Sequence, residues 1–408
     1  MKRDMQHNRR HQIWFEPSLW IGAFILSLSW LSLMMMFHFD PFGHGSHDSY
    51  TLQALAWRAG KISLGKDYPW LELAIYKNDW YVSFPPVPTI VMLPLTYIFG
   101  EETPGNLITG LYFLGSYFAA YFLSRRVRNP SESCFLAVFM TMGCSLFDFS
   151  LNGDVWNQAQ LLCFFLTTLF VLGITGNNPT GWGTGLACLA LSVGCRPFQA
   201  VFVPFGLIRL WQNLKKISEK QLFIRVVPYI AFPLLIAITL AWYNSVRFGN
   251  PLEFGHNYLP EFTRDPSKPQ LGMQYVLPNF KNLIRLPYIN NGRLEFVRFN
   301  GFAFWMVNPI YISMPVALMV RAIQKKLDCT DALLVVTITL ELFALLTHKT
   351  LGGWQFGARY LCDPIPLMFY VQIRRRDRFT NWEKAVAVFA IIFNLYGSIV
   401  FRMRNIKF

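Results

Sequence analysis

Charge is scarce in this sequence. Only 15% of its 408 residues are Asp, Glu, Lys or Arg, whereas 53% are hydrophobic and the mean hydropathy is +0.31. Soluble domains carry about 25% charged residues, and no polar stretch here is long enough to form one. We therefore expect an all-α, polytopic membrane protein that forms a single transmembrane domain over residues 1–408.

Cysteine pairs with the spacing of metal or redox motifs are also lacking. The chain has seven cysteines, an odd number, and none of them forms a CxxC pair. Most of them, such as Cys163 and Cys188, lie within apolar runs. Disulfide frameworks and zinc sites show even or regularly spaced cysteines. We interpret these residues as packing groups.

The net charge of +14 does not follow the pattern of a nucleic-acid-binding protein. Basic residues form short clusters between apolar runs and do not alternate with aromatic residues along one face. Such clusters are typical of the cytoplasmic ends of membrane spans. We therefore expect membrane lipids, and no nucleic acid, among the partners.

Apolar runs that follow one another along the chain predict about 11 transmembrane helices with the N-terminus inside. The first run, Leu19 to Phe39, is longer than a signal-peptide core and lacks a small-residue cleavage site, so we expect it to be retained. The basic tail RMRNIKF would lie outside, which is the one exception to the charge rule.

The segment VPTIVMLPLTYIFG at 87–100 is too short for a crossing and contains Pro94. If it crossed, the basic stretch SRRVRNP would fall outside. We therefore predict a juxtamembrane or re-entrant helix in the outer leaflet. Two large extracytoplasmic loops result, at 40–104 and 243–299.

Acidic residues stand where the chain leaves the membrane on the outer side. Asp48, in HGSHDSY, could take the proton from an acceptor hydroxyl or amine, or it could be a loop acid that only solvates the end of the first span. Asp154, in SLNGDVWNQ of the second outer loop, would face the same cavity by topology; its alternative is an Asn-Gly-Asp turn. Asp40 precedes Pro41 and could equally be a turn residue.

The first outer loop resembles that of the GT-C glycosyltransferases, polytopic enzymes that take a sugar from a polyprenyl-phosphate carrier. This family includes protein O-mannosyltransferases and lipid A aminoarabinose transferases. The likeness rests on a helix that closes at Gly60, on NDWYVSFPPVP, and on a short helix that ends in Phe99 and Gly100. Three further stretches are similar to later parts of these enzymes: CRPF (195–198), WYNSVRFGNPLEFGHNY (242–258) and WQFGARYLCDPIPL (354–367).

The resemblance implies a hexosyl- or pentosyltransferase that uses a polyprenyl-phosphate-linked sugar donor, with Asp48 as the expected base. The acceptor would be a lipid, a glycan or a protein. The compact chain, which has no retrieval signal, favours a bacterial inner membrane with the active site facing outward. The chain departs from the oligosaccharyltransferase branch, because it has no large C-terminal soluble domain and no clear DxD or DxE in its second outer loop. That departure leaves metal dependence open.

Cationic and aromatic residues on the outer side are candidates for binding the donor. Arg196 lies between two short apolar segments, where its guanidinium could bind the carrier phosphate as a fork or could reach outward to lipid headgroups. Arg359, Tyr360 and Arg247 could share the phosphate or the sugar, or anchor the ends of spans. Tyr81, with its neighbours Trp80 and Phe84, could stack a sugar ring or belong to the interfacial aromatic belt.

His44 and His47 could tune Asp48 or, if the protein depends on a divalent cation such as Mg or Mn, hold that ion together with Asp48. Two histidines three residues apart with one carboxylate form a weak metal pattern.

Two other functions remain open. A transporter or lipid flippase would use charged groups within the membrane, such as Glu341 in ITLELFALL. The chain shows no internal repeat, and a large outer loop rich in acids and aromatics is unnecessary for transport. A structural or assembly subunit that keeps the fold without catalysis is the third possibility.

Overall fold

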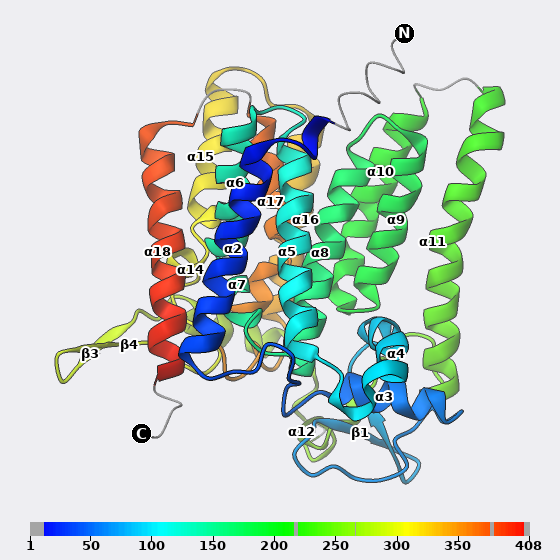
Figure 1. Ribbon diagram of the computed structural model, residues 1–408. Helices are drawn as coiled ribbons and strands as arrows, with labels where there is room; N and C mark the ends of the chain where they lie inside the picture. The colour runs from blue at the N-terminus through cyan, green and yellow to red at the C-terminus, as the bar shows by residue number, and fades with distance from the viewer. Residues whose placement is uncertain (1–11, 216–218, 266, 376–378, 404–408) are drawn as a thin grey trace.

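The computed structural model describes residues 12–215, 219–265, 267–375 and 379–403. Long helices run side by side, and short helices and strands gather at one end of the bundle (Figure 1). The bundle helices are α2 (Pro17–Met36), α5 (Gly105–Ser124), α6 (Pro130–Met142), α8 (Val155–Ile174), α9 (Pro179–Val193), α10 (Val203–Leu214), α11 (Glu219–Phe248), α15 (Ile310–Ile323), α16 (Cys329–Leu346), α17 (Ile365–Arg374) and α18 (Asn381–Met403). The predicted all-α membrane architecture is confirmed.

Within the described residues, six helices are long and apolar enough to cross a membrane. They are α2, α5, α8, the Ile230–Phe248 part of α11, α16 and α18. The predicted total of about 11 spans is not confirmed, because the remaining bundle helices are shorter. The basic ends on which the orientation depends, residues 1–11 and 404–408, lie outside the described residues. We name the end that carries the short elements the outer end, as the charge pattern predicts.

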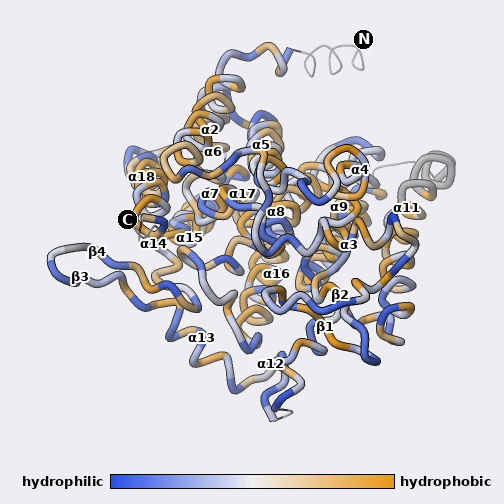
Figure 2. Tube along the Cα trace, turned by 60° about the horizontal axis from the view of Figure 1, so that its bottom comes forward, coloured by the Kyte–Doolittle hydropathy of each residue, from blue (hydrophilic) through white to orange (hydrophobic). Residues whose placement is uncertain are grey.

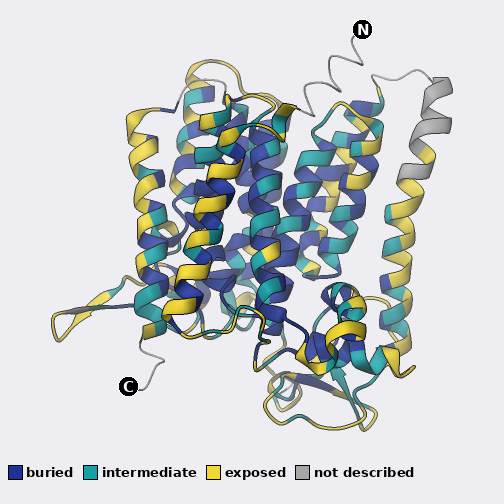
Figure 3. Cartoon of the chain, in the orientation of Figure 1, coloured by how far each residue is buried: buried dark blue, intermediate teal, exposed yellow. Residues whose placement is uncertain are grey.

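The helices differ in how far the protein covers them (Figure 3). Helix α8 is central, with 78% of its apolar window buried, whereas only 17% of the corresponding window of α11 is buried. The exposed side chains of α2, α11 and α18 are largely apolar, as expected for helices that face lipid. Helix α8 therefore forms the centre of the bundle, and its first residue, Val155, lies at the outer end.

The first outer loop folds into α3 (Ser49–Arg58), a hairpin of β1 (Leu73–Tyr76) and β2 (Asp79–Val82), α4 (Val87–Phe99) and the turn η1 (Gly100–Glu102). Helix α4 packs against α3 at the outer end and is too short to cross, which confirms the predicted juxtamembrane helix. Gly60 (φ +70°) and Gly100 (φ +61°) follow the ends of these helices in a backbone conformation that glycine adopts without strain.

The β1–β2 hairpin was not predicted. Its turn residues Lys77 and Asn78 both have positive φ values, 51° and 63°, as a two-residue type I′ turn requires.

The late outer loop begins at residue 249 and not at 243, because α11 continues to Phe248. The loop lies along one side of the outer end, as Figure 2 shows. It contains η3 (His256–Tyr258), α12 (Pro260–Thr263), η4 (Met273–Tyr275), α13 (Val276–Leu283), the hairpin of β3 (Tyr288–Asn290) and β4 (Arg293–Glu295), and α14 (Phe304–Val307). Three short elements join bundle helices: α7 (Leu146–Phe149), η2 (Pro197–Phe202) and η5 (Arg359–Cys362).

Candidate active site

A cavity of about 390 Å³, with charged, polar and aromatic residues in its wall, lies between the start of α8, the η2 and η5 turns and the late outer loop. Three of the residues predicted from the sequence, Arg196, Arg359 and Tyr360, lie in its wall. The fold brings them together although the first is far from the other two in the sequence. The remaining wall is formed by Phe84, Pro85, Trp156, Ala159, Cys195, Pro197, Phe198, Leu252, Glu253, Phe254, His256, Asn257, Gln270, Leu271 and His348.

Arg196 is fixed in place by a buried carboxylate and an aromatic ring. Its Nε donates to both carboxylate oxygens of Asp363, at 3.0 and 2.9 Å, and its Cζ atom lies 4.5 Å from the centre of the Tyr360 ring. Asp363 also accepts a hydrogen bond from Gln160 Nε2 of α8 at 2.6 Å. The two Nη groups of Arg196 make no hydrogen bond to any described residue. The guanidinium is therefore held rigidly, with donors left for a ligand.

Arg359 supplies a second cation in the same wall. Its Nη2 donates to the carbonyl of Gly352 at 2.9 Å, and its Nε is buried without a hydrogen-bond partner among the described residues. A Cβ at position 352 would lie 3.1 Å from that Nη2, so a larger residue would displace the guanidinium. Because unpaired buried donors are costly, Arg359 is best satisfied when an anion enters the cavity.

Two histidines that the sequence analysis did not single out also line the cavity. The rings of His256 and His348 lie 5.9 Å apart. Nδ1 of His256 lies 3.2 Å from the carbonyl of Ser83, which assigns the proton to Nδ1 and leaves Nε2 as an acceptor. Burial lowers the pKa of both side chains, that of His348 to about 3, so both are neutral at pH 7. The only signal in the sequence was the FGHNY segment noted above.

Asp48 begins α3 and is enclosed by its own hydrogen bonds. Oδ1 accepts from the backbone N–H of Thr51 at 3.1 Å and from Gln158 Nε2 at 2.9 Å, and Oδ2 accepts from Thr51 Oγ1 at 2.6 Å. Burial raises its pKa to about 6. The carboxylate does not line the cavity. The phenol of Tyr50, which has no hydrogen-bond partner among the described residues, interacts electrostatically with both Asp48 and Arg196.

Asp154 connects the two outer loops that contain the predicted acids. Its Oδ1 accepts from the backbone N–H of His47 at 2.9 Å, and its Oδ2 accepts from Asn152 Nδ2 at 2.9 Å. The backbone N–H of Val155 donates to the carbonyl of His47 at 3.2 Å. These contacts fasten the HGSHDSY segment to the start of α8.

The residues proposed for a divalent cation do not form one site. His44 Nδ1 lies 3.2 Å from Glu102 Oε2, His47 Nδ1 lies 3.7 Å from Asp154 Oδ1, and Asp48 bonds to Thr51 and Gln158. In the part of the chain that the structure describes, no group of three or more His, Cys, Asp or Glu side chains could hold a metal ion. The donor set therefore does not fit Mg or Mn, and we derive no chemical step from one.

Three other candidates from the sequence lie away from the cavity wall. Asp40 Oδ1 accepts from the backbone N–H of Phe42 at 2.9 Å, which is the turn geometry considered above. Arg247 donates to the carbonyl of Val82 and to Asn244 Oδ1, at 3.1 and 2.9 Å, and so fastens α11 to β2. Tyr81 packs with its ring 5.4 Å from that of Phe248.

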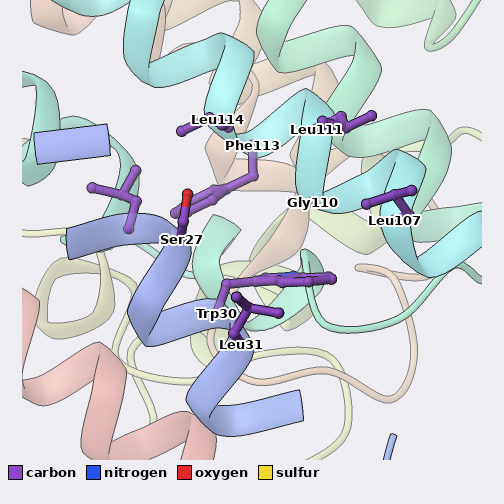
Figure 4. A pocket seen from close by; sticks show the side chains of 9 residues that line it. Ser27, Trp30, Leu31, Leu107, Gly110, Leu111, Phe113 and Leu114 are labelled. Atoms are coloured by element: carbon purple, nitrogen blue, oxygen red, sulfur yellow. The ribbon is translucent and has the colours of Figure 1, made fainter. Parts of the chain in front are cut away.

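A second hollow, of about 200 Å³, lies between α2 and α5 (Figure 4). It contains no titratable side chain, since its walls are Leu26, Ser27, Trp30, Leu31, Leu107, Gly110, Leu111, Phe113 and Leu114. Of the two hollows, only the larger one has charged and titratable side chains in its wall, so it is the one that could bind a charged group.

Solved structures with the same architecture are membrane glycosyltransferases. ArnT from Cupriavidus metallidurans, bound to undecaprenyl phosphate, matches with a TM-score of 0.54 and 14% identity over 91% of this chain and 63% of that chain. The Archaeoglobus fulgidus oligosaccharyltransferase matches with a TM-score of 0.54 and 12% identity over 95% of this chain and 56% of that chain. The chain thus spans less than two thirds of either protein.

No protein-family profile and no curated protein matches the sequence. Identities this low show a shared fold. The resemblance noted in the first outer loop agrees with it, and the molecule is an integral membrane protein with the fold of the GT-C glycosyltransferases.

Proposed function

We propose that this protein is a glycosyltransferase that moves a hexosyl or pentosyl group from a polyprenyl-phosphate carrier to an acceptor at the outer face of the membrane. The observation that carries the proposal is the pair of arginines, Arg196 and Arg359, with unused donors in one cavity. The shared fold with ArnT, which was solved with undecaprenyl phosphate bound, supports the same kind of carrier.

The arginine pair suits a phosphate chemically. A guanidinium offers two parallel N–H donors to two phosphate oxygens, and such charge-assisted bonds are about twice as strong as neutral ones. Asp363 neutralises one face of Arg196 and so orients the Nη groups without filling them. When the sugar leaves, negative charge grows on the carrier phosphate, and donors already in place stabilise that charge without reorganisation.

Asp48 is our proposed base for the acceptor. Its pKa of about 6 suits a group that accepts a proton near neutral pH. The carboxylate is separated from the cavity, so its action requires a shift of the first loop. His256 is the competing candidate, because its Nε2 accepts no hydrogen bond from a described residue and its ring lies in the cavity wall.

The acceptor is proposed to be a lipid, a glycan or a protein that reaches the cavity from the extracytoplasmic side. The cavity wall includes Glu253 and Asn257 from the late loop and Trp156 from α8, which offer polar and aromatic contacts to an acceptor. A bacterial inner membrane, with the cavity facing outward, is the proposed location.

Donor consumption by the purified protein tests the proposal. The full chain is reconstituted and incubated with a panel of radiolabelled polyprenyl-phosphate sugars, beside Arg196→Ala and the control Arg58→Gln. Arg58 is an outer-loop arginine that donates to the backbone of Thr96 and does not line the cavity. We expect the wild type and the control to consume one donor and Arg196→Ala to lose that activity. Folded protein that consumes no donor would contradict the proposal.

Transport is the second candidate, and one observation favours it. Glu341 of α16 is fully buried, and neither carboxylate oxygen has a hydrogen-bond partner among the described residues. Such a group within a span is a functional candidate by default, but Glu341 does not line the cavity. Movement of labelled lipid across vesicles, lost in Glu341→Gln and retained in Arg196→Ala, would favour transport over transfer.

A further inference from the structure

Part of the late outer loop extends sideways beyond the helix bundle. We name residues 276–299 the lateral arm; it contains α13 and the β3–β4 hairpin. The hairpin projects beside the outer end of α18 and away from the other helices, as two views show (Figures 1 and 2). Helix α18 is long and apolar enough to be a span, and the hairpin lies at the level of its outer end.

Helix α13 has one face bound to protein and one face uncovered. Asn279 Nδ2 donates to the carbonyls of Leu346 and His348, at 2.9 and 2.7 Å, and so fixes α13 to the end of α16. Leu277 and Phe280, which lie three residues apart and therefore on one face, are 61% and 46% exposed. The helix thus holds an apolar stripe outward from a rigid attachment.

The hairpin continues the apolar surface. Ile289 in β3 is 77% exposed, and Tyr288 beside it is 50% exposed. Side chains this apolar are costly in water, and tyrosine is enriched where a membrane meets water. The position of the arm at the lipid boundary explains why it tolerates them.

The charge of the arm is positive. It contains Lys281, Arg285, Arg293 and Arg298 against the single acid Glu295. Glu295 is buried and accepts hydrogen bonds from Tyr288 Oη and Asn290 Nδ2 of the same hairpin, at 3.0 and 2.8 Å, so little of its carboxylate reaches the surface. Amphipathic segments that combine basic residues with exposed apolar side chains bind to anionic lipid surfaces.

We propose that the lateral arm is an interfacial anchor that lies on the outer leaflet, with its apolar side chains among the acyl chains and the exposed Lys281 and Arg285 on anionic lipid headgroups. A lipid surface is favoured over a protein partner because the arm leaves the bundle sideways at the level of the helix ends. The proposal does not depend on the transferase activity, since the arm's exposed residues are separate from Arg196 and Arg359.

Fluorescence of a labelled cysteine tests the anchor. The full chain carries Cys329→Ser, which removes the exposed thiol, together with Ile289→Cys labelled with an environment-sensitive dye. The matched control is Asp67→Cys, an exposed position of the first outer loop. Each protein is reconstituted in vesicles of zwitterionic lipid, with or without anionic lipid. We expect iodide to quench the label at 289 several-fold less than the label at 67, and the protection at 289 to increase with anionic lipid.

A second variant separates the apolar from the charged contribution. In Lys281→Gln with Arg285→Gln, the label at 289 should lose its response to anionic lipid and keep part of its protection. Equal quenching at 289 and 67 in all vesicles would overturn the anchor. Protection that is the same with and without anionic lipid would overturn the role of the basic residues. Protection found in native membranes but absent from pure lipid vesicles would assign the arm to a protein partner instead.

Discussion

The two sides of the candidate site differ in how far the protein satisfies its own polar groups. On the cationic side, Arg196 and Arg359 keep unused donors in a cavity. On the acidic side, Asp48 and Asp154 bond to neighbouring N–H and hydroxyl groups of the chain. Unused donors need a ligand, whereas satisfied acceptors hold the loops in shape. The comparison indicates that the site is built for an anion, and that the acids act only after some rearrangement.

The largest effect on stability is expected when Arg196 loses Asp363, the buried carboxylate that pairs with it. Asp363→Asn leaves the buried Arg196 without its counter-charge, and breaking such a pair costs about 3–5 kcal/mol. Thermal unfolding in detergent should show a strongly destabilised protein. Removing both charges, in Arg196→Gln with Asp363→Asn, should restore part of the stability. Full stability of Asp363→Asn alone would show that the pair does not fix the guanidinium.

Removing the cations should abolish catalysis; Arg196→Ala also leaves the buried Asp363 carboxylate without its counter-charge, so activity is compared per folded protein. Arg196→Ala and Arg359→Ala are each expected to reduce kcat/KM for the donor by about 100- to 1000-fold, the range found when one stabilising donor is lost. Arg58→Gln should stay within about twofold, because it touches only the first loop. A loss of less than tenfold in both alanine variants would remove the distinction between the two sides.

The pH dependence of kcat/KM tests whether Asp48 is the base. Burial raises its pKa to about 6, and a base works only when deprotonated, so kcat/KM should rise tenfold per pH unit below that value and level off above it. Asp48→Asn should lower the plateau by about 100-fold and remove this limb. His256→Gln serves as the comparison. If the limb persists in Asp48→Asn and disappears in His256→Gln, the histidine is the base.

The smallest effects on stability are expected for Asp154 and Asp40, whose carboxylates hold a loop and a turn in place. Asp154→Ala removes one hydrogen bond that fastens HGSHDSY to the start of α8 and one to Asn152, and should cost about 1–3 kcal/mol in unfolding free energy. Its effect on kcat/KM should follow this loss and show no new pH dependence. Asp40→Ala removes one exposed turn bond and should cost less than about 1 kcal/mol. A pH-dependent loss of activity in Asp154→Ala at full stability would return Asp154 to the chemistry.

Local patterns could be predicted from the sequence because they need no knowledge of distant contacts. The length of an apolar run, the proline in 87–100 and the glycines after α3 and α4 each act within one element. Arg196 and Arg359 could be selected because ionisable groups beside short apolar segments are few, and Tyr360 because it follows Arg359 in the FGARY stretch. Their meeting in one cavity depends on the fold.

The features that were missed depend on tertiary contacts. Asp363 lies inside the WQFGARYLCDPIPL stretch, yet its pairing with Arg196 joins η5 to the turn after α9. His256 and His348 meet because the late loop folds against the end of α16. The metal pattern considered for Asp48, His44 and His47 does not form one site among the described residues, since the Asp48 carboxylate caps α3 and His47 turns toward Asp154.

Direct binding of the carrier tests the central claim that the arginine cavity holds a polyprenyl phosphate. Radiolabelled undecaprenyl phosphate is titrated onto the full chain in nanodiscs, with Arg196→Gln and the control Arg58→Gln in parallel. The account predicts saturable binding that weakens at least tenfold in Arg196→Gln and is unchanged in the control. Equal binding by all three proteins, or no saturable binding by the wild type, would contradict it.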